Sequence, residues 1–324
     1  MTAPVVDTHT HLLAAGHWPA AWWDRVAEDW AAMEPGRRPE QIRDRIEPGL
    51  VDEDGARMIE RMDRADVAMS VILPIDWGPD LQSADAIAHA NDHALALSRT
   101  YPGRFAAFVG VDPRRPGTLD TLTARIERGE VHGLKLYPGC GWQPASDAAM
   151  EIYAVVEKAG LPVLFHTGDP LPILDRDLSN PIHLLPVAES FPDLKIWLGH
   201  AGAPDWWDEA CVVAEASAHV KLEMSVWLWD DSDEKARKLW LRHLTEARNR
   251  FGAERLLFGS DHVSGHKVRG DAFLDTIVTA YRSLPVDGPP ETAFTQREID
   301  LILGLNALAD LGLETTAANG VSAK

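Results

Sequence analysis

Five polar side chains in this sequence have the types and the spacing of a metal site. His9 and His11 are two residues apart, and alternate residues of a strand share one face, so both imidazoles can point to one spot. His166, His200 and Asp261 each end a separate apolar run. A single histidine in such a place is more often a hydrogen-bonded core residue than a metal ligand. Several together are costly to bury without partners, and a divalent metal supplies such partners.

Secondary-structure elements must bring these five residues together. The sequence predicts eight strands whose ends place them near one another. Runs rich in Val, Ile, Leu and Phe recur along the chain, and their nearly continuous apolar character is typical of parallel strands buried on both faces. The predicted strands are 5–9, 67–74, 104–111, 131–138, 161–168, 194–202, 220–226 and 255–261. Amphipathic segments lie between them, as parallel neighbours require. The pattern predicts one α/β domain over 1–324, a (β/α)₈ TIM barrel whose strand ends converge on one mouth.

The alternative fold is an open doubly wound sheet. That fold usually carries a Gly-rich phosphate turn after its first strand, and HTHLLAAG at 9–16 is not one. Residues 14–50 form a long insertion after strand 1, which we expect to be a lid or pocket wall, or else a helical flap packed on the rim. Extra C-terminal helices are predicted at 271–283 and 296–312, and 314–324 has the composition of a disordered tail.

The order of these motifs resembles the amidohydrolase superfamily and, within it, the amidohydrolase-2 branch that includes relatives of aminocarboxymuconate-semialdehyde decarboxylase. The resemblance rests on DTHTHL, GLKLYP, PVLFHTG, LGHAG, LLFGSD and the late segment ILGLNALADLGL, and it runs from residue 5 to about 313. It implies that His9, His11 and His166 bind one divalent metal, Zn in the first place with Mn or Fe as alternatives. Asp261 is implied as a further ligand or a base, and His200 as the residue that polarises or protonates the reacting group.

Lys135 is the other residue with chemical potential, because alternation along 131–138 places it on the barrel-facing side with Tyr137. Buried lysine is rare without a partner. It can bind a substrate carboxylate or carbonyl, or, as a carboxylated lysine, bridge two metals; we favour the mononuclear site. A structural pairing with Glu223 is the third possibility. We also expect Tyr137, Trp142, Trp227 and Trp229 to line the substrate pocket, although aromatic residues after strands are as often rim packing.

Composition limits the possible functions. The formal charge is −19 and the pI about 5.0, which disfavours binding to nucleic acid or anionic lipid. Cys140 and Cys211 lack metal-type spacing, and the N-terminus has no secretory pattern. No stretch approaches the roughly 20 apolar residues of a membrane span. We therefore expect a cytoplasmic protein that acts on a small molecule, and the family resemblance leaves a homo-oligomer open.

Two reactions fit this site. The first is hydrolysis, in which a metal-activated water attacks an amide, lactone or related carbonyl. The second is a metal-dependent, non-oxidative decarboxylation of an aromatic or enoic acid, for which the same ligands would serve. The segments GLKLYPGCGW and FGSDHVSG depart from what we expect of decarboxylase relatives, and for this reason we favour hydrolysis. A metal-free binding barrel would lack a ligand position, and none is missing.

Overall fold

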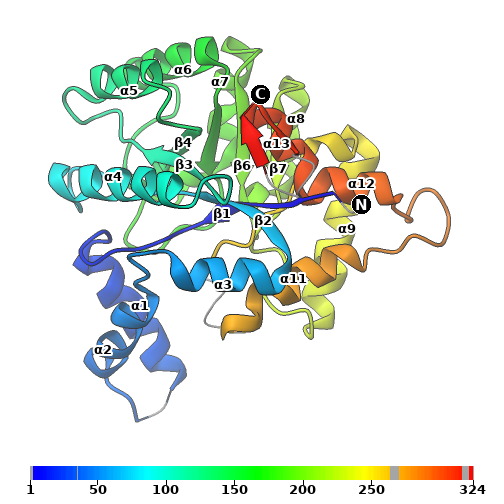
Figure 1. The fold of residues 1–324 in the computed structure, drawn as a ribbon, viewed down its shortest axis with the longest axis horizontal. Coiled ribbons are helices and arrows are strands. Elements are labelled where there is room, and N and C mark those ends of the chain that lie inside the picture. The colour runs from blue at the N-terminus through cyan, green and yellow to red at the C-terminus, as the bar shows by residue number, and fades with distance from the viewer. Residues whose placement is uncertain (1–2, 35, 263–269, 316–320, 324) are drawn as a thin grey trace.

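The computed structural model describes residues 3–34, 36–262, 270–315 and 321–323. Eight parallel strands follow one another around a barrel in sequence order (Figure 1), which confirms the predicted TIM barrel. The strands are β1 Val5–Thr10, β2 Val67–Ile72, β3 Phe105–Gly110, β4 Gly133–Leu136, β5 Pro162–His166, β6 Lys195–Gly199, β7 Val220–Glu223 and β8 Leu256–Leu257.

Backbone hydrogen bonds close the barrel between its last and first strands. Thr8 N–H donates to the carbonyl of Phe258 (3.1 Å), and His11 N–H donates to the carbonyl of His262 (2.6 Å). Thr10 and His262 form a parallel bridge. The segment that carries Asp261 is therefore held beside the segment that carries His9 and His11.

Helices cover the outside of the barrel and occupy the amphipathic segments between the strands. They are α1 Ala20–Met33, α2 Pro39–Leu50, α3 Ala56–Ala65, α4 Ala84–Thr100, α5 Thr118–Glu127, α6 Asp147–Ala159, α7 Leu185–Ser190, α8 Trp207–Ala216, α9 Glu234–Phe251, α11 Phe273–Arg282, α12 Gln296–Asp300 and α13 Asn306–Leu311. Local chemistry sets several ends: the Ser83 side chain caps α4 and the Asp233 carboxylate caps α9. A π-helical turn, Leu301–Leu305, joins α12 to α13.

The barrel interior is apolar at one end and polar at the other. Side chains such as Val6, Phe108 and Trp197 fill it, and Ala307 and Leu308 of α13 pack beneath them. Burying each large apolar side chain is worth about 1.5–3 kcal/mol. Because α13 closes the end where the strands begin, the carboxyl ends of the strands are left for the polar residues.

Two segments outside the repeat have defined structure. Helices α1 and α2, in the insertion after β1, pack on each other and project from the barrel (Figure 1). In the region expected to be a disordered tail, β9 (Leu313–Thr315) pairs antiparallel with β10 (Val321–Ala323). Residues 316–320 and 324 of the predicted tail lie outside the described residues. None of the described helices is long and apolar enough to cross a membrane.

Candidate active site

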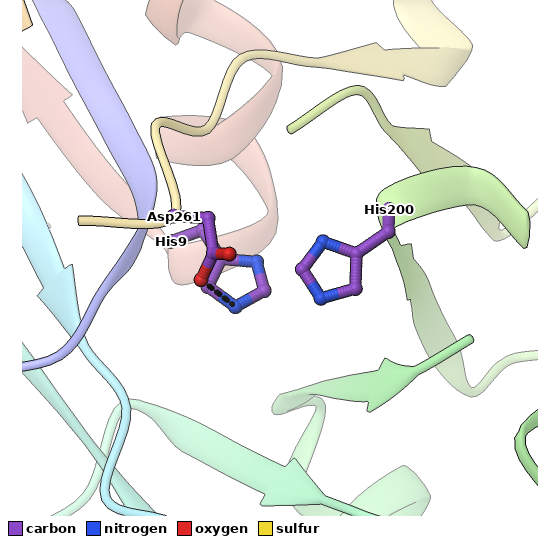
Figure 2. Close-up of side chains that lie close together, drawn as sticks. All are labelled: His9, His200 and Asp261. Atoms are coloured by element: carbon purple, nitrogen blue, oxygen red, sulfur yellow. Dashed lines mark ion pairs between the residues drawn. The ribbon is translucent and has the colours of Figure 1, made fainter. Parts of the chain in front are cut away.

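The structure brings the five predicted residues to one place at the carboxyl ends of the strands. Nitrogen or oxygen atoms of His9, His200 and Asp261 lie within 4.8 Å of one another, and all three residues are buried (Figure 2). The Asp261 Oδ1 is 3.3 Å from His11 Nε2 and 3.5 Å from His9 Nε2. His166 Nδ1 is 3.1 Å from His200 Nε2. The residues therefore form one continuous cluster.

Hydrogen bonds fix which nitrogen of His9 and His11 faces the cluster. His9 Nδ1 is 2.8 Å from the Glu223 carboxylate, which can only accept, so Nδ1 carries the proton. His11 Nδ1 likewise donates to the carbonyl of Leu73 at 2.8 Å. Both Nε2 atoms are therefore unprotonated in the neutral ring. A partner on the opposite nitrogen is the usual arrangement around a metal-binding histidine.

The same reasoning applies to His200 and His166. The Ser225 hydroxyl donates to Glu223, so it must accept from His200 Nδ1 (2.8 Å). His166 Nε2 donates to the carbonyl of Gly168 (3.0 Å). His200 Nε2 and His166 Nδ1 are then both unprotonated and face each other at 3.1 Å. Two lone pairs at this distance repel unless a cation or a proton lies between them.

Electrostatics favour a cation at this spot. Burial lowers the pKa values of His9, His166 and His200 well below their usual range, so these rings are neutral at neutral pH. Burial would raise the pKa of the Asp261 carboxyl, but positive charge on the neighbouring histidines lowers it below its usual range, so an ionised Asp261 beside neutral imidazoles needs a cation at the same spot. Four ring nitrogens and a carboxylate therefore converge. This donor set suits a divalent metal such as Zn, Mn or Fe.

Two buried carboxylates hold the ligand-bearing segments in place. Glu223, named from the sequence as a possible partner of Lys135, also accepts from the backbone N–H groups of His200 (3.1 Å) and Ser225 (2.8 Å). Asp7 accepts from the backbone and hydroxyl of Ser260 (2.8 and 2.6 Å) and from the backbone of His9 (3.1 Å). Burial raises the pKa of Asp7 to about 6, and these hydrogen bonds oppose that rise.

Close packing around Glu223 requires glycine at position 259. A Cβ there would lie 2.1 Å from Glu223 Oε1 and 2.9 Å from His9 Cβ. The FGSD segment can therefore approach the cluster only without a side chain at this position. Ser260, the next residue, was not singled out from the sequence, since its role depends on Asp7 across the barrel seam.

The backbone of the site is unusual. Of the five described non-glycine residues with positive φ, four are in or beside the cluster: His200 (69°), Ala201 (42°), Val226 (62°) and Asp261 (50°). Such conformations cost about 1–3 kcal/mol each and persist only where the surroundings hold them. The indole N–H of Trp227 donates to the carbonyl of His200 at 2.8 Å, which anchors that left-handed residue.

Lys135 lies inside the cluster rather than in an ion pair with Glu223. Its Nζ is 3.3 Å from His9 Nε2, and the residue is 1% exposed. Burial lowers the pKa of Lys135 to about 8, against the opposing effect of the Asp261 and Glu223 charges. At neutral pH most of it is still an ammonium. Tyr137 lies beside it, stacked on the His166 ring at 3.9 Å.

The cluster forms the polar end of a cavity of about 410 Å³. Lys135 and Tyr137 line this cavity, as expected, whereas Trp142 and Trp227 are not among its lining residues. Both are buried in packing, at 4% and 5% exposure. The tryptophans that do line the cavity are Trp18, Trp22, Trp30, Trp77 and Trp229. Trp229 was among the residues that the sequence placed near the pocket, whereas Trp77 was not singled out, since only the assembled barrel turns it toward the mouth.

Comparisons with known proteins agree with this architecture. The amidohydrolase-2 family model, described as an amidohydrolase, matches residues 6–313. No curated protein sequence matches the chain. Similar solved structures include an uncharacterized TIM-barrel protein from Bordetella bronchiseptica, with 22% identity, a TM-score of 0.65 and coverage of 95% of this chain and 99% of that one.

Two further structures carry names of activities. One is a probable 2-pyrone-4,6-dicarboxylic acid hydrolase from Acinetobacter baumannii with citric acid bound, with 14% identity, a TM-score of 0.61 and coverage of 95% and 99%. The other is a 5-carboxyvanillate decarboxylase from Novosphingobium aromaticivorans in complex with manganese and 4-hydroxy-3-methoxy-5-nitrobenzoic acid, with 16% identity, a TM-score of 0.66 and coverage of 95% and 96%. At these identities the likeness concerns the fold. The family model spans nearly the whole chain, and the chain therefore belongs to the amidohydrolase-2 family.

Proposed function

We propose that this protein is a metal-dependent hydrolase of a small-molecule carbonyl compound, such as a lactone, an ester or an amide. The observation that carries the proposal is the convergence of unprotonated imidazole nitrogens and the ionised Asp261 at the closed end of a cavity. Family membership supports the enzyme class. The similar structures, which include a named hydrolase and a named decarboxylase, leave the reaction open.

We propose that His9, His11, His166 and Asp261 would hold one divalent cation. The ligand atoms within 4.8 Å of one another are those of His9, Asp261 and His200, so His200 is close enough to join them, while His11 and His166 contact Asp261 and His200. We propose Zn, with Mn or Fe as alternatives. A metal there would supply Lewis-acid activation, which polarises a carbonyl and lowers the pKa of water. The binuclear alternative, with a carboxylated Lys135, stays a secondary prediction.

The protein groups divide the proton chemistry among them. The Asp261 carboxylate is ionised and can take a proton from the attacking water. Because Nδ1 of His200 is committed to Ser225 and its Nε2 is unprotonated, His200 can accept from Asp261 the proton taken from water and pass it to the leaving group. The Lys135 ammonium is the cation that can donate to the carbonyl oxygen as negative charge develops on it.

Decarboxylation remains the second candidate because of Lys135. Its ammonium at the closed end of the cavity would bind a substrate carboxylate as well as a carbonyl oxygen. In that reaction a protonated group must deliver a proton to carbon. Apart from Lys135, which the substrate carboxylate would engage, the described cluster offers Asp261 in its ionised form and imidazoles that are neutral, which favours hydrolysis.

A product assay on metal-loaded protein separates the two. Lactones, esters, amides and aromatic acids would be screened with a pH indicator for acid release and a coupled assay for CO₂. We expect acid release without CO₂, and we expect Asp261→Asn to lower kcat at least 10²-fold. The exposed carboxylate Asp193→Asn is the matched control. CO₂ release from an aromatic acid, with no hydrolysis of any carbonyl compound, would replace this proposal by the second candidate.

A further inference from the structure

The outer part of the cavity is a chamber lined by tryptophan. Trp22, Val26 and Trp30 are four residues apart on α1, so they form one stripe along the helix, and all three line the cavity. Trp77 and Trp229 line it from the loops after β2 and β7. We call this the aromatic chamber.

The aromatic chamber is continuous with the polar cluster. Trp18 packs edge-on against Trp22 (ring centroids 4.2 Å apart) and against Trp77 (5.5 Å). The same Trp18 contacts the ring of His11 at 5.7 Å, and Trp77 contacts Tyr137 at 5.6 Å. Trp18 and Trp77 are buried, at 7% and 2% exposure. A ligand that reacts at the cluster would therefore extend directly into a preformed apolar space.

Charge in the cavity is confined to a few residues. Among the lining residues that the structure describes, the only cation is Lys135, at the polar end. The charged residue toward the outer part is Asp169, whose carboxylate pairs with Arg176 at 2.6 Å. A ligand carboxylate in the aromatic chamber would lose water and gain no described cationic partner, which is unfavourable.

We infer that the substrate carries a bulky, uncharged alkyl or aryl group next to its reacting carbonyl, and that the aromatic chamber binds this group. The inference rests on the proposed function for the reacting end. It differs from the dicarboxylic acid named for the Acinetobacter baumannii protein, because a second carboxylate would occupy the aromatic chamber. The apolar group supplies the binding free energy, and Lys135 with the cluster orients the oxygen atoms.

Binding of product-like acids tests this directly. Calorimetry with the metal-loaded protein would compare benzoate, 4-butylbenzoate and the dicarboxylate isophthalate. Each buried methylene is worth roughly a fourfold gain in affinity, so four carbons predict a gain of about 10²-fold for 4-butylbenzoate over benzoate. Isophthalate is expected to bind no better than benzoate. Tighter binding of isophthalate than of 4-butylbenzoate, or no gain from the butyl group, would overturn the inference.

Variants of α1 test whether the affinity gained from the butyl group comes from the aromatic chamber. Trp30 is only partly buried, so Trp30→Ala is expected to fold and to reduce the butyl gain at least tenfold. Met33→Ala, on the same helix but 69% exposed, is the control and keeps the gain. Trp30→Arg should shift preference toward isophthalate. An unchanged butyl gain in Trp30→Ala would contradict the assignment.

The two proposals can fail separately. If no carbonyl compound is hydrolysed while 4-butylbenzoate still binds about 10²-fold more tightly than benzoate, the proposed reaction fails and the aromatic chamber stands. If hydrolysis is found and small esters react as fast as those with large apolar groups, the aromatic chamber fails and the reaction stands.

Discussion

Glu223 illustrates how single side chains set the chemistry of this site. Its two oxygens accept four hydrogen bonds, from His9, His200 and the backbone and hydroxyl of Ser225. These bonds hold the protons of His9 and His200 on the nitrogens that face away from the cluster, directly or through Ser225. The unprotonated nitrogens are thereby left for the cluster. One buried carboxylate therefore decides the proton positions on two of the four imidazoles.

Trp227 helps to hold His200 in place through one hydrogen bond. Trp227→Phe removes the indole N–H that donates to the carbonyl of His200, where φ is 69°. A buried carbonyl left without its partner costs about 1–3 kcal/mol. We expect Trp227→Phe to lower the melting temperature by several degrees and kcat about tenfold, because His200 loses its fixed position.

Trp142→Phe is the matched control for this prediction. Trp142 is equally buried, but its Nε1 has no hydrogen-bond partner among the described atoms. Its replacement removes the same atoms and breaks no bond. Equal losses of kcat in the two variants, measured with the same substrate and metal, would show that the bond to His200 does not position the residue.

At the scale of elements, strands were predictable and the walls of the cavity were not. Nearly continuous apolar runs identify buried parallel strands, and the residue that ends each run falls at the barrel mouth, which is why His166 and Asp261 could be placed from sequence. The walls depend on how loops and α1 pack across the mouth. Trp142 and Trp229 each follow a strand, yet only Trp229 lines the cavity. Which tryptophan turns inward is decided by contacts between elements distant in sequence.

Helices α8 and α9 and the loop after β7 pack together around His243. The ring of His243 on α9 contacts the rings of Trp207 (4.2 Å) and Trp227 (4.5 Å). Burial, with Arg242 adding to it and Asp208 opposing it, lowers the pKa of His243 to about 4, from 6.5. The unfolded chain therefore binds more protons than the folded one between pH 6.5 and 4, and the stability from this group is lost as the pH falls through that window.

The variant His243→Phe keeps a ring between the tryptophans and removes the titration. Between pH 7.5 and 5 the wild-type melting temperature should fall by about 2 °C more than that of the variant, for a difference of roughly 1 kcal/mol after solvent screening. Thermal melts at several pH values, with metal content held constant, measure this difference. Parallel curves for the two proteins would mean that the His243 pKa is not lowered by folding.

At the scale of the whole molecule, the barrel joins a stable end to a strained one. The end closed by α13 is apolar and well packed. The opposite end contains two imidazole nitrogens that face each other, a carboxylate, an ammonium and four residues with positive φ. This division of the molecule follows from the fold, since all eight strands deliver their last residues to the same mouth. The sequence pattern predicted the fold and the five converging residues, while the cluster's hydrogen-bonded orientation emerges only when strands β1, β5, β6 and β7 meet.

The strain at the mouth predicts that metal stabilises the whole protein. A ligand that binds only the folded state adds about 2.7 kcal/mol when its concentration is 100 times its Kd, which corresponds to about 5 °C in the melting temperature of a protein of this size. We expect chelation with EDTA to lower the melting temperature by this amount and Zn to restore it.

The double variant His9→Ala, His11→Ala should melt at the same temperature with EDTA and with Zn, because it lacks two of the donors around Asp261. The exposed His219→Ala should respond as the wild type does. A wild-type melting temperature that ignores both EDTA and added Zn, Mn or Fe would remove the cation from the site and leave the facing nitrogens of His166 and His200 to share a proton instead.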